Sequence, residues 1–167
     1  MSEWIDLLSK EKSFVMCDRK NYLWVIHADK IPPHIGISVN NYYFSLKVNG
    51  KDVKYAISKL LNVLNSKLIP CLVIELTTEF TLDLINMVYS HYSNKIIKNQ
   101  TCLTPILELF KQNNSLIIHE LLADLYSKDC LKAVFGLNLP EDFVSIPTYN
   151  KTIVDQHIFE LQYAKRR

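Results

Sequence analysis

The chain is poor in residues that interrupt secondary structure, with only three glycines and six prolines among its 167 residues. It also has no Ser/Gly-rich linker, internal repeat or low-complexity tract that would mark a boundary between two domains. Apolar residues make up 49% of the chain and charged residues 22%, which is typical of a globular domain with a packed core. We therefore expect residues 1–167 to form a single domain.

Charge of one sign is not in excess. The formal net charge is +2, and lysines alternate with acidic residues instead of forming a basic stripe, so we expect no nucleic-acid partner. No apolar run reaches the roughly 20 residues that a membrane-spanning helix needs. Glu3 and Asp6 stand where a secretion signal would be basic and then apolar. These absences predict a cytoplasmic protein without a membrane span.

The four cysteines, Cys17, Cys71, Cys102 and Cys130, are far apart in the chain. They form no C-x-x-C pair and have no Cys/His spacing typical of a zinc site, so we expect neither a metal ion nor a cofactor. Reduced thiols suit a chain of this length without an export signal better than disulfides do. Apart from Cys102, each cysteine is predicted to be a small buried residue.

The first half of the chain predicts an antiparallel sheet. Apolar segments bounded by turn residues predict buried strands over 21–28, 34–39, 42–48 and 71–76. Asn40 and Asn41 suit the tight turn between two of these strands, because asparagine tolerates positive φ. Asn49 and Gly50 predict the turn that ends this hairpin.

Helical spacing dominates the rest of the chain. Apolar residues at i, i+3, i+4 and i+7 predict an amphipathic helix that begins at Val53 and ends before Pro70. Further helices are expected over 3–10, 81–92, 105–111, 116–126, 131–135 and 153–161. The sequence thus predicts an α+β fold in which a small antiparallel sheet from the N-terminal half packs against several helices.

Two residues have the chemistry of a thiol and its base. His34 follows Pro32 and Pro33 at the start of a predicted strand, and a rigid strand would hold its imidazole as a general base requires. Cys102 stands at the start of a predicted helix, where backbone N–H groups and the helix dipole would stabilise a thiolate. The alternatives are a structural histidine and a packed cysteine. A helix that starts at Thr104 would also leave the thiol on the entry loop.

The other histidines receive less weight. His27 follows a predicted strand and stands near Asp29, so it is a reserve candidate for a base. His91, His119 and His157 fall on predicted helices among polar neighbours and are expected to face solvent.

The order of these motifs resembles that of the circularly permuted papain-like thiol hydrolases and acyltransferases, of which the lecithin:retinol acyltransferase-like branch is the best-known example. The shared features are a His-x-Gly-Ile-x-Val strand at 34–39, a tight turn, an aromatic-rich returning strand and a later cysteine that opens a helix. The resemblance covers residues 21–112. It implies a permuted papain-like fold with His34 as the base, Cys102 as the nucleophile and Ser45 as the third polar residue.

The resemblance further implies a cysteine-dependent hydrolase or acyltransferase that acts on an amide or ester bond through a thioester. Its substrate would be a small molecule, a peptide or a lipid. The Asn-Cys-Glu-His-like setting of the acyltransferase branch is replaced here by Thr-Cys-Leu-Thr at 101–104, and a serine orients an imidazole less firmly than a carboxylate. The alternative is a non-catalytic protein-interaction domain with the same fold, in which Tyr42, Tyr43 and Tyr55 contact a partner. The sequence leaves the substrate and the oligomeric state open.

Overall fold

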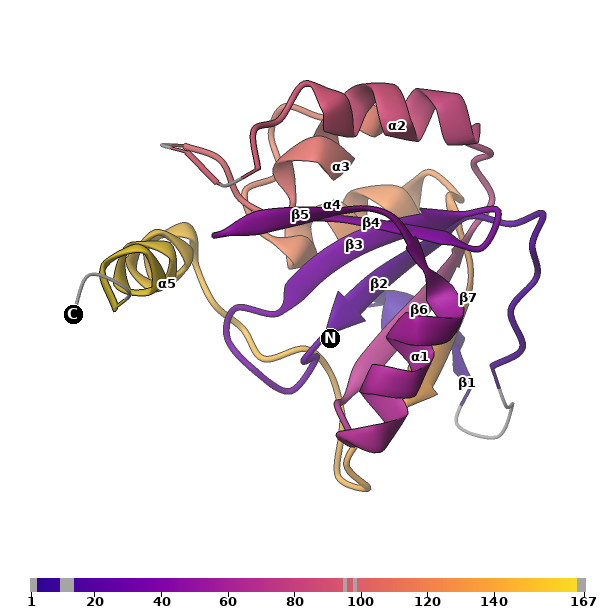
Figure 1. Cartoon of the computed structure of the whole chain (residues 1–167). Helices are drawn as coiled ribbons and strands as arrows, with labels where there is room; N and C mark the ends of the chain where they lie inside the picture. The colour runs from indigo at the N-terminus through magenta and orange to yellow at the C-terminus, as the bar shows by residue number, and fades with distance from the viewer. Residues whose placement is uncertain (1–2, 10–13, 95, 98, 165–167) are drawn as a thin grey trace.

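The computed structural model describes residues 3–9, 14–94, 96–97 and 99–164, and Figure 1 shows the path of the backbone. One sheet runs through the protein in the order β1-β7-β6-β2-β3-β4-β5. Its strands are β1 (Leu8–Ser9), β2 (Tyr22–Ile26), β3 (His34–Val39), β4 (Tyr42–Lys47), β5 (Gly50–Ala56), β6 (Cys71–Leu76) and β7 (Leu131–Leu137). Neighbouring strands are antiparallel, except that β1 and β7 pair in parallel.

The helices cover the two faces of the sheet unequally. They are the 3-10 helix η1 (Glu3–Leu7) and the α-helices α1 (Ile57–Ser66), α2 (Leu82–Ser90), α3 (Thr104–Leu109), α4 (Ile118–Ser127) and α5 (Lys151–Ala164). Helix α1 packs on one face, while α2, α3 and α4 pack on the other, and α5 stands beside one end of the sheet (Figure 1). The predicted α+β class with an antiparallel sheet is confirmed, but the sheet is larger than predicted and extends into the second half of the chain.

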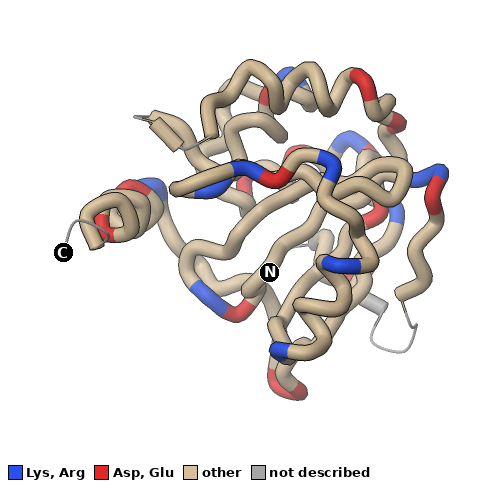
Figure 2. The backbone as a smooth tube through the Cα atoms, viewed as in Figure 1, with Lys and Arg blue, Asp and Glu red and all other residues tan. Residues whose placement is uncertain are grey.

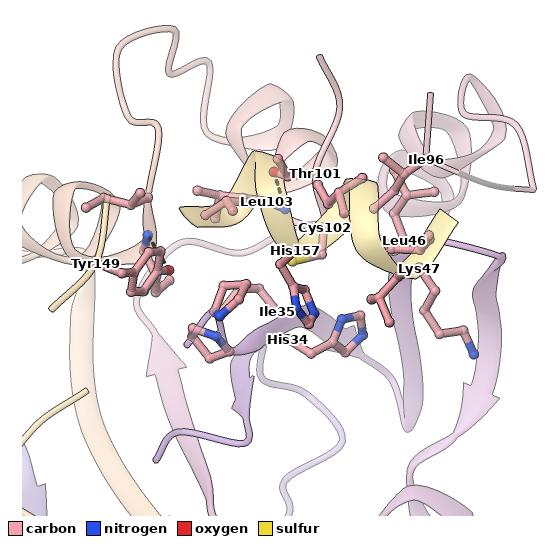
Figure 3. Close-up of a pocket in the computed structure, with 18 of the residues that line it drawn as sticks. His34, Ile35, Leu46, Lys47, Ile96, Thr101, Cys102, Leu103, Tyr149 and His157 are labelled. Atoms are coloured by element: carbon pink, nitrogen blue, oxygen red, sulfur yellow. Dashed lines mark hydrogen bonds between the residues drawn. The ribbon is translucent and has the colours of Figure 1, made fainter. Parts of the chain in front are cut away.

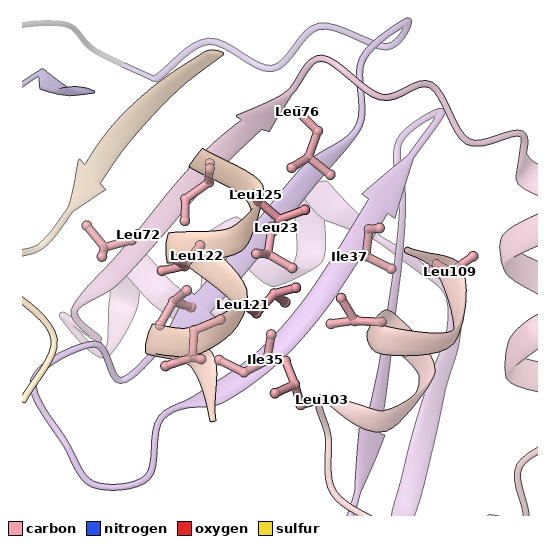
Figure 4. Packing of buried hydrophobic residues seen from close by; sticks show 14 of the residues in the cluster. Leu23, Ile35, Ile37, Leu72, Leu76, Leu103, Leu109, Leu121, Leu122 and Leu125 are labelled. Atoms are coloured by element: carbon pink, nitrogen blue, oxygen red, sulfur yellow. The ribbon is translucent and has the colours of Figure 1, made fainter. Parts of the chain in front are cut away.

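Strand alternation divides the core into two layers, which we call the α4 face and the α1 face. Along β2, Leu23 and Val25 belong to the α4 face, whereas Trp24 and Ile26 belong to the α1 face. Figure 4 shows leucines of α4 packed against strand residues of the α4 face. Because helices cover both faces, β2 and β6 are buried along their whole length, which explains their largely apolar sequences.

Two segments that the sequence predicts to be helical are strands. Residues 53–56 belong to β5, which forms a hairpin with β4, so α1 begins only at Ile57. Residues 131–135 belong to β7, which pairs with β6. Each of these two pairings contains a β-bulge. A bulge inserts one extra residue and so changes the spacing of side chains on one face from two to three, which imitates a helical pattern.

The other predicted elements lie close to their expected places. The ends of α2, α3, α4 and α5 differ from the predicted ends by at most three residues. The N-terminal helix predicted over 3–10 is the short 3-10 helix η1 followed by β1, and residue 10 lies outside the described residues. Helix α2 begins as capping rules predict, because the Leu84 N–H donates to the Thr81 hydroxyl.

Charged side chains are dispersed, and in the view of Figure 2 basic and acidic segments alternate without a band of one sign. One acidic residue is buried. Glu75 on β6 forms ion pairs with Lys20 at 2.7 Å and with Lys132 at 3.2 Å, which compensate its burial. None of the helices in the described part of the chain combines the length and the apolar composition that crossing a membrane requires.

Candidate functional site

A pocket lies at the end of the sheet where β3 begins and β4 ends. Its cavity has a volume of about 460 Å³. The walls come from three parts of the chain that are distant in sequence: residues 32–49, residues 96–118 and residues 149–161. Helix α5 closes one side with Val154, His157, Ile158 and Leu161 (Figure 3). The site therefore depends on the tertiary fold and not on one local motif.

The walls of the pocket are largely apolar. The apolar lining includes Ile35, Leu46, Val48, Ile96, Leu103, Leu116, Ile117, Ile118, Val154, Ile158 and Leu161. The residues with polar side chains are His34, Lys47, Asn49, Thr101, Cys102, Tyr149 and His157. No aspartate or glutamate occurs among the described residues that line the cavity. The cavity is thus suited to an apolar molecule that carries few polar groups.

Cys102 lies in the turn that precedes α3. The residue is half-buried, but protein atoms crowd its sulfur. The pKa of the thiol is raised to about 11, because burial disfavours the thiolate more than the nearby backbone N–H groups of Ile35, Cys102 and Leu103 favour it. The Leu103 N–H itself donates to the Thr101 hydroxyl at 3.2 Å. Helix α3 begins at Thr104. The thiol therefore stands on the entry loop, and burial outweighs the thiolate stabilisation that the sequence predicts.

His34 is the first residue of β3 and pairs with Ile26 of β2. Its Nε2 atom is buried and has no hydrogen-bond partner in the described part of the chain. The pKa of the imidazole is lowered to about 4, chiefly because burial disfavours the cation. The charge of Asp52 raises this pKa, whereas Lys47 and His27 lower it. A neutral imidazole is therefore favoured at neutral pH.

His34 and Cys102 line the same pocket, but they approach it from different faces of the sheet. Paired residues of neighbouring strands share a face, so His34 lies on the α1 face with Ile26. Ile35 follows on the α4 face, and Cys102 packs against the core of that face. Because Nε2 of His34 has no partner among the described residues, it does not accept a hydrogen bond from the thiol in this arrangement.

Ser45 lies on β4 directly opposite Gly36 of β3 and is fully buried. Its hydroxyl donates to Oδ2 of Asp52 at 2.8 Å. The ammonium of Lys47 donates to Oδ1 of the same carboxylate at 2.7 Å. Ser45 thus holds Asp52, and Asp52 is the acidic group that acts electrostatically on His34. Sequence reasoning does not find Asp52, since this residue directly precedes a segment whose spacing predicts a helix.

The histidines predicted to face solvent divide into two groups. His91 is exposed and forms an ion pair with Glu108 at 3.3 Å. His157 instead lines the pocket. His119 is also turned inward, because its Nε2 lies 3.1 Å from the Ile146 carbonyl oxygen. The predictions for His119 and His157 are wrong because the C-terminal segment folds back against the body of the protein, which local sequence patterns do not reveal.

The aromatic surface proposed for partner binding is not formed as predicted. Tyr43 is buried, and its ring makes an edge contact with Trp24 at 6.2 Å. Tyr55 is half-buried and packs against the α1 face, whereas Tyr42 is exposed. In the described part of the chain, no group of three His, Cys, Asp or Glu side chains is placed to hold a metal ion.

Comparison of the chain with protein-family models, with curated proteins and with solved structures found no match. The resemblance to permuted papain-like proteins therefore stays a prediction. A functional hypothesis therefore rests on the structure, that is, on the α+β fold with its mainly antiparallel sheet and on the pocket at the end of that sheet.

Proposed function

We propose that the protein binds a small, largely apolar molecule in the pocket between the sheet end and α5. One observation carries this proposal, the cavity of about 460 Å³ within apolar walls. The lining residues Leu116 and Leu161 are 50% and 40% exposed, so an apolar ligand that covered them would remove apolar surface from water. The volume lies within the range of roughly 300–1,000 Å³ that small-molecule sites occupy.

The walls also predict how affinity depends on the ligand. Each methylene group transferred from water into an apolar site contributes about 0.8 kcal/mol, which corresponds to roughly fourfold tighter binding. We therefore expect affinity to rise with the length of an aliphatic chain until the cavity is full.

Replacing Leu161 by aspartate is expected to weaken binding of the neutral apolar dye Nile red by about tenfold or more, because the change puts a charge into an apolar wall. Leu161 lines the pocket from α5 and is 40% exposed, so the fold should tolerate the change. Ile153 is a matched control, since it lies on the same helix, is 39% exposed and is not among the described lining residues. Ile153→Asp should change the dissociation constant by less than about twofold.

Fluorescence titration of the dye into the parent chain and both variants measures the three dissociation constants. Equal weakening in Leu161→Asp and Ile153→Asp would contradict the proposal, and so would a parent chain that shows no saturable binding. Circular dichroism of the variants verifies that both retain the fold.

Thiol-dependent acyl transfer is a second candidate, because His34 and Cys102 line one cavity and nearby backbone N–H groups lower the pKa of the thiol in opposition to burial. In this reaction His34 accepts the thiol proton and the thiolate attacks the carbonyl carbon of an ester or amide. The C–O or C–N bond then breaks, and the alcohol or amine leaves with the proton from His34. Water or an amine finally cleaves the thioester and restores the thiol. The unliganded site disfavours the first step. Moving a proton from a thiol of pKa about 11 to an imidazole of pKa about 4 is unfavourable by on the order of 10 kcal/mol.

The rate at which iodoacetamide alkylates Cys102, measured against pH by mass spectrometry, separates the two candidates. For a binding protein we expect a midpoint near pH 11, as the raised pKa of this thiol implies, and no change in His34→Ala. A midpoint at or below about 8.5, the usual thiol value, that rises in His34→Ala would favour thiol chemistry. Replacing Cys17 and Cys130 by serine removes the other two thiols that are partly exposed.

A further inference from the structure

The polar side chains that line the pocket lack acidic groups among the described residues. They include two imidazoles, an amide, two hydroxyls, a thiol and an ammonium group, but no carboxylate occurs among the described lining residues. A ligand cation would therefore meet no opposite charge there. The one lysine of this lining, Lys47, has its ammonium paired with Asp52 at 2.7 Å. The lining thus favours a ligand whose polar group accepts hydrogen bonds, and it offers little charge for a dianion.

His34 supplies an independent observation. Its Nε2 atom is buried without a partner in the described part of the chain, and an unsatisfied buried polar atom costs about 1–3 kcal/mol. Figure 3 shows His34 from β3 and His157 from α5 extending into the same region of the pocket. Because Nε2 is buried in the unliganded structure, the imidazole has to turn toward the cavity before a ligand atom can bond to it. Such a bond would remove the penalty, so the favoured position for the ligand's polar group is beside His34.

We propose that the ligand is a monoanionic amphiphile, an aliphatic carboxylate, whose head group is hydrogen-bonded to Nε2 of His34 and whose chain fills the apolar cavity. This inference rests on the proposed binding function and names the chemical class of its ligand. A monoanion matches the site because one protonated imidazole balances its charge.

Binding of such a ligand is linked to proton uptake. A carboxylate beside His34 favours the imidazolium form, so the complex binds a proton that the separate partners do not hold at neutral pH. The charged and titratable groups around this imidazole are Asp52 on β5, Lys47 on β4 and His27 after β2, with His157 on α5 and Cys102 before α3 across the pocket. The Asp52 carboxylate is held by Lys47 and Ser45, so the ligand carboxylate does not have to displace it.

Isothermal titration calorimetry of the full chain with decanoate, 1-decanol and decylamine tests the inference. Decanoate should bind with uptake of up to about one proton, read from the dependence of the heat on the ionisation enthalpy of the buffer. Its affinity should fall by up to about tenfold for each unit by which the pH rises from about 6.5 to about 8. Binding of 1-decanol should be independent of pH, and decylamine should bind most weakly.

His34→Gln should abolish the proton uptake and weaken decanoate binding by about tenfold or more at the lower pH, because a charge-assisted hydrogen bond is lost. The same variant should change the affinity for 1-decanol by less than about threefold. His91→Gln is the matched control, since His91 is exposed, pairs with Glu108 and is not among the described lining residues. It should leave every constant unchanged.

NMR of the histidine rings gives a second readout that does not need a variant. At pH 7 the His34 ring should change from its neutral to its protonated signals when decanoate is added, and 1-decanol should not cause this change. Equal affinities for decanoate and 1-decanol without proton uptake would overturn the inference and leave the binding function standing. Failure of all three chains and of Nile red to bind would overturn the binding function itself.

Discussion

Replacing Gly36 by alanine is expected to destabilise the protein by about 3 kcal/mol, the upper part of the usual range for overpacking a core. Gly36 lies in the middle of β3, between Trp24 of β2 and Ser45 of β4. A Cβ atom at this position would lie 2.3 Å from ring atoms of Tyr43. This distance is far inside van der Waals contact, so the ring or the strand would have to move.

The Tyr43 ring has little freedom to move away. It is fully buried on the α1 face and makes an edge contact with Trp24. The indole N–H of Trp24 donates to the Ser38 hydroxyl at 2.8 Å, which fixes the indole in turn. A displaced Tyr43 ring would therefore disturb a packed and hydrogen-bonded group, and the strain would remain in the folded state.

Urea unfolding of the variants measures this effect as a shift of the midpoint with an unchanged slope. Gly50→Ala is the matched control, because a Cβ atom at Gly50 would have no neighbour within 4 Å and neither glycine has positive φ. Its free energy of unfolding should change by less than about 0.5 kcal/mol. Combining Gly36→Ala with Tyr43→Leu should cost less than the sum of the single changes, because the smaller side chain makes room. Equal effects at Gly36 and Gly50 would contradict the packing described.

The hairpin of β3 and β4 could be predicted because its determinants are local. Asn40 and Asn41 have φ values of 48° and 65°, the conformation that asparagine tolerates in a tight turn. The flanking strands are apolar on both faces, and their lengths agree with the prediction to within one residue. Here the local preference and the tertiary packing favour the same structure.

Strands β5 and β7 were missed because bulges disturb their alternation. In the β6–β7 pairing one extra residue of β7 lies between the partners of Glu75 and Leu76, and Leu131 and Val134 both join the α4-face core. Their separation of three residues is the spacing that indicates a helix. In β5 the extra residue lies beside Lys54, which has a φ of 54°. A positive φ at lysine follows from the tertiary pairing and leaves no signal in the sequence.

The candidate site shows the same division between local and long-range information. The sequence singled out His34 and Cys102 from their positions at the starts of elements, and both line the pocket. It did not reveal that α5 closes this pocket, because Val154 is the only buried residue of that helix among those described. Without a strong apolar stripe, the contribution of His157 could not be predicted from periodicity.

Lowering the pH from about 7 to about 4 is expected to remove roughly 3 kcal/mol of stability through His34. The pKa of this imidazole is about 4 in the folded protein, against the ordinary histidine value of 6.5. Well above pH 6.5 both states are neutral at this residue, and its contribution does not change with pH. As the pH falls from 6.5 towards 4, the unfolded chain binds a proton that the folded protein does not, so the free energy of unfolding decreases.

Urea unfolding of the parent chain and of His34→Gln across this pH range isolates the contribution of His34, because acid titration of every other group is common to both proteins. The difference in free energy of unfolding should shift by roughly 3 kcal/mol in favour of the variant as the pH falls. If His34→Gln runs parallel to the parent, the imidazole is not held neutral by burial. In that case the buried Nε2 atom would carry no penalty for decanoate to remove. The stability measurement therefore also tests the proposed reason for carboxylate binding.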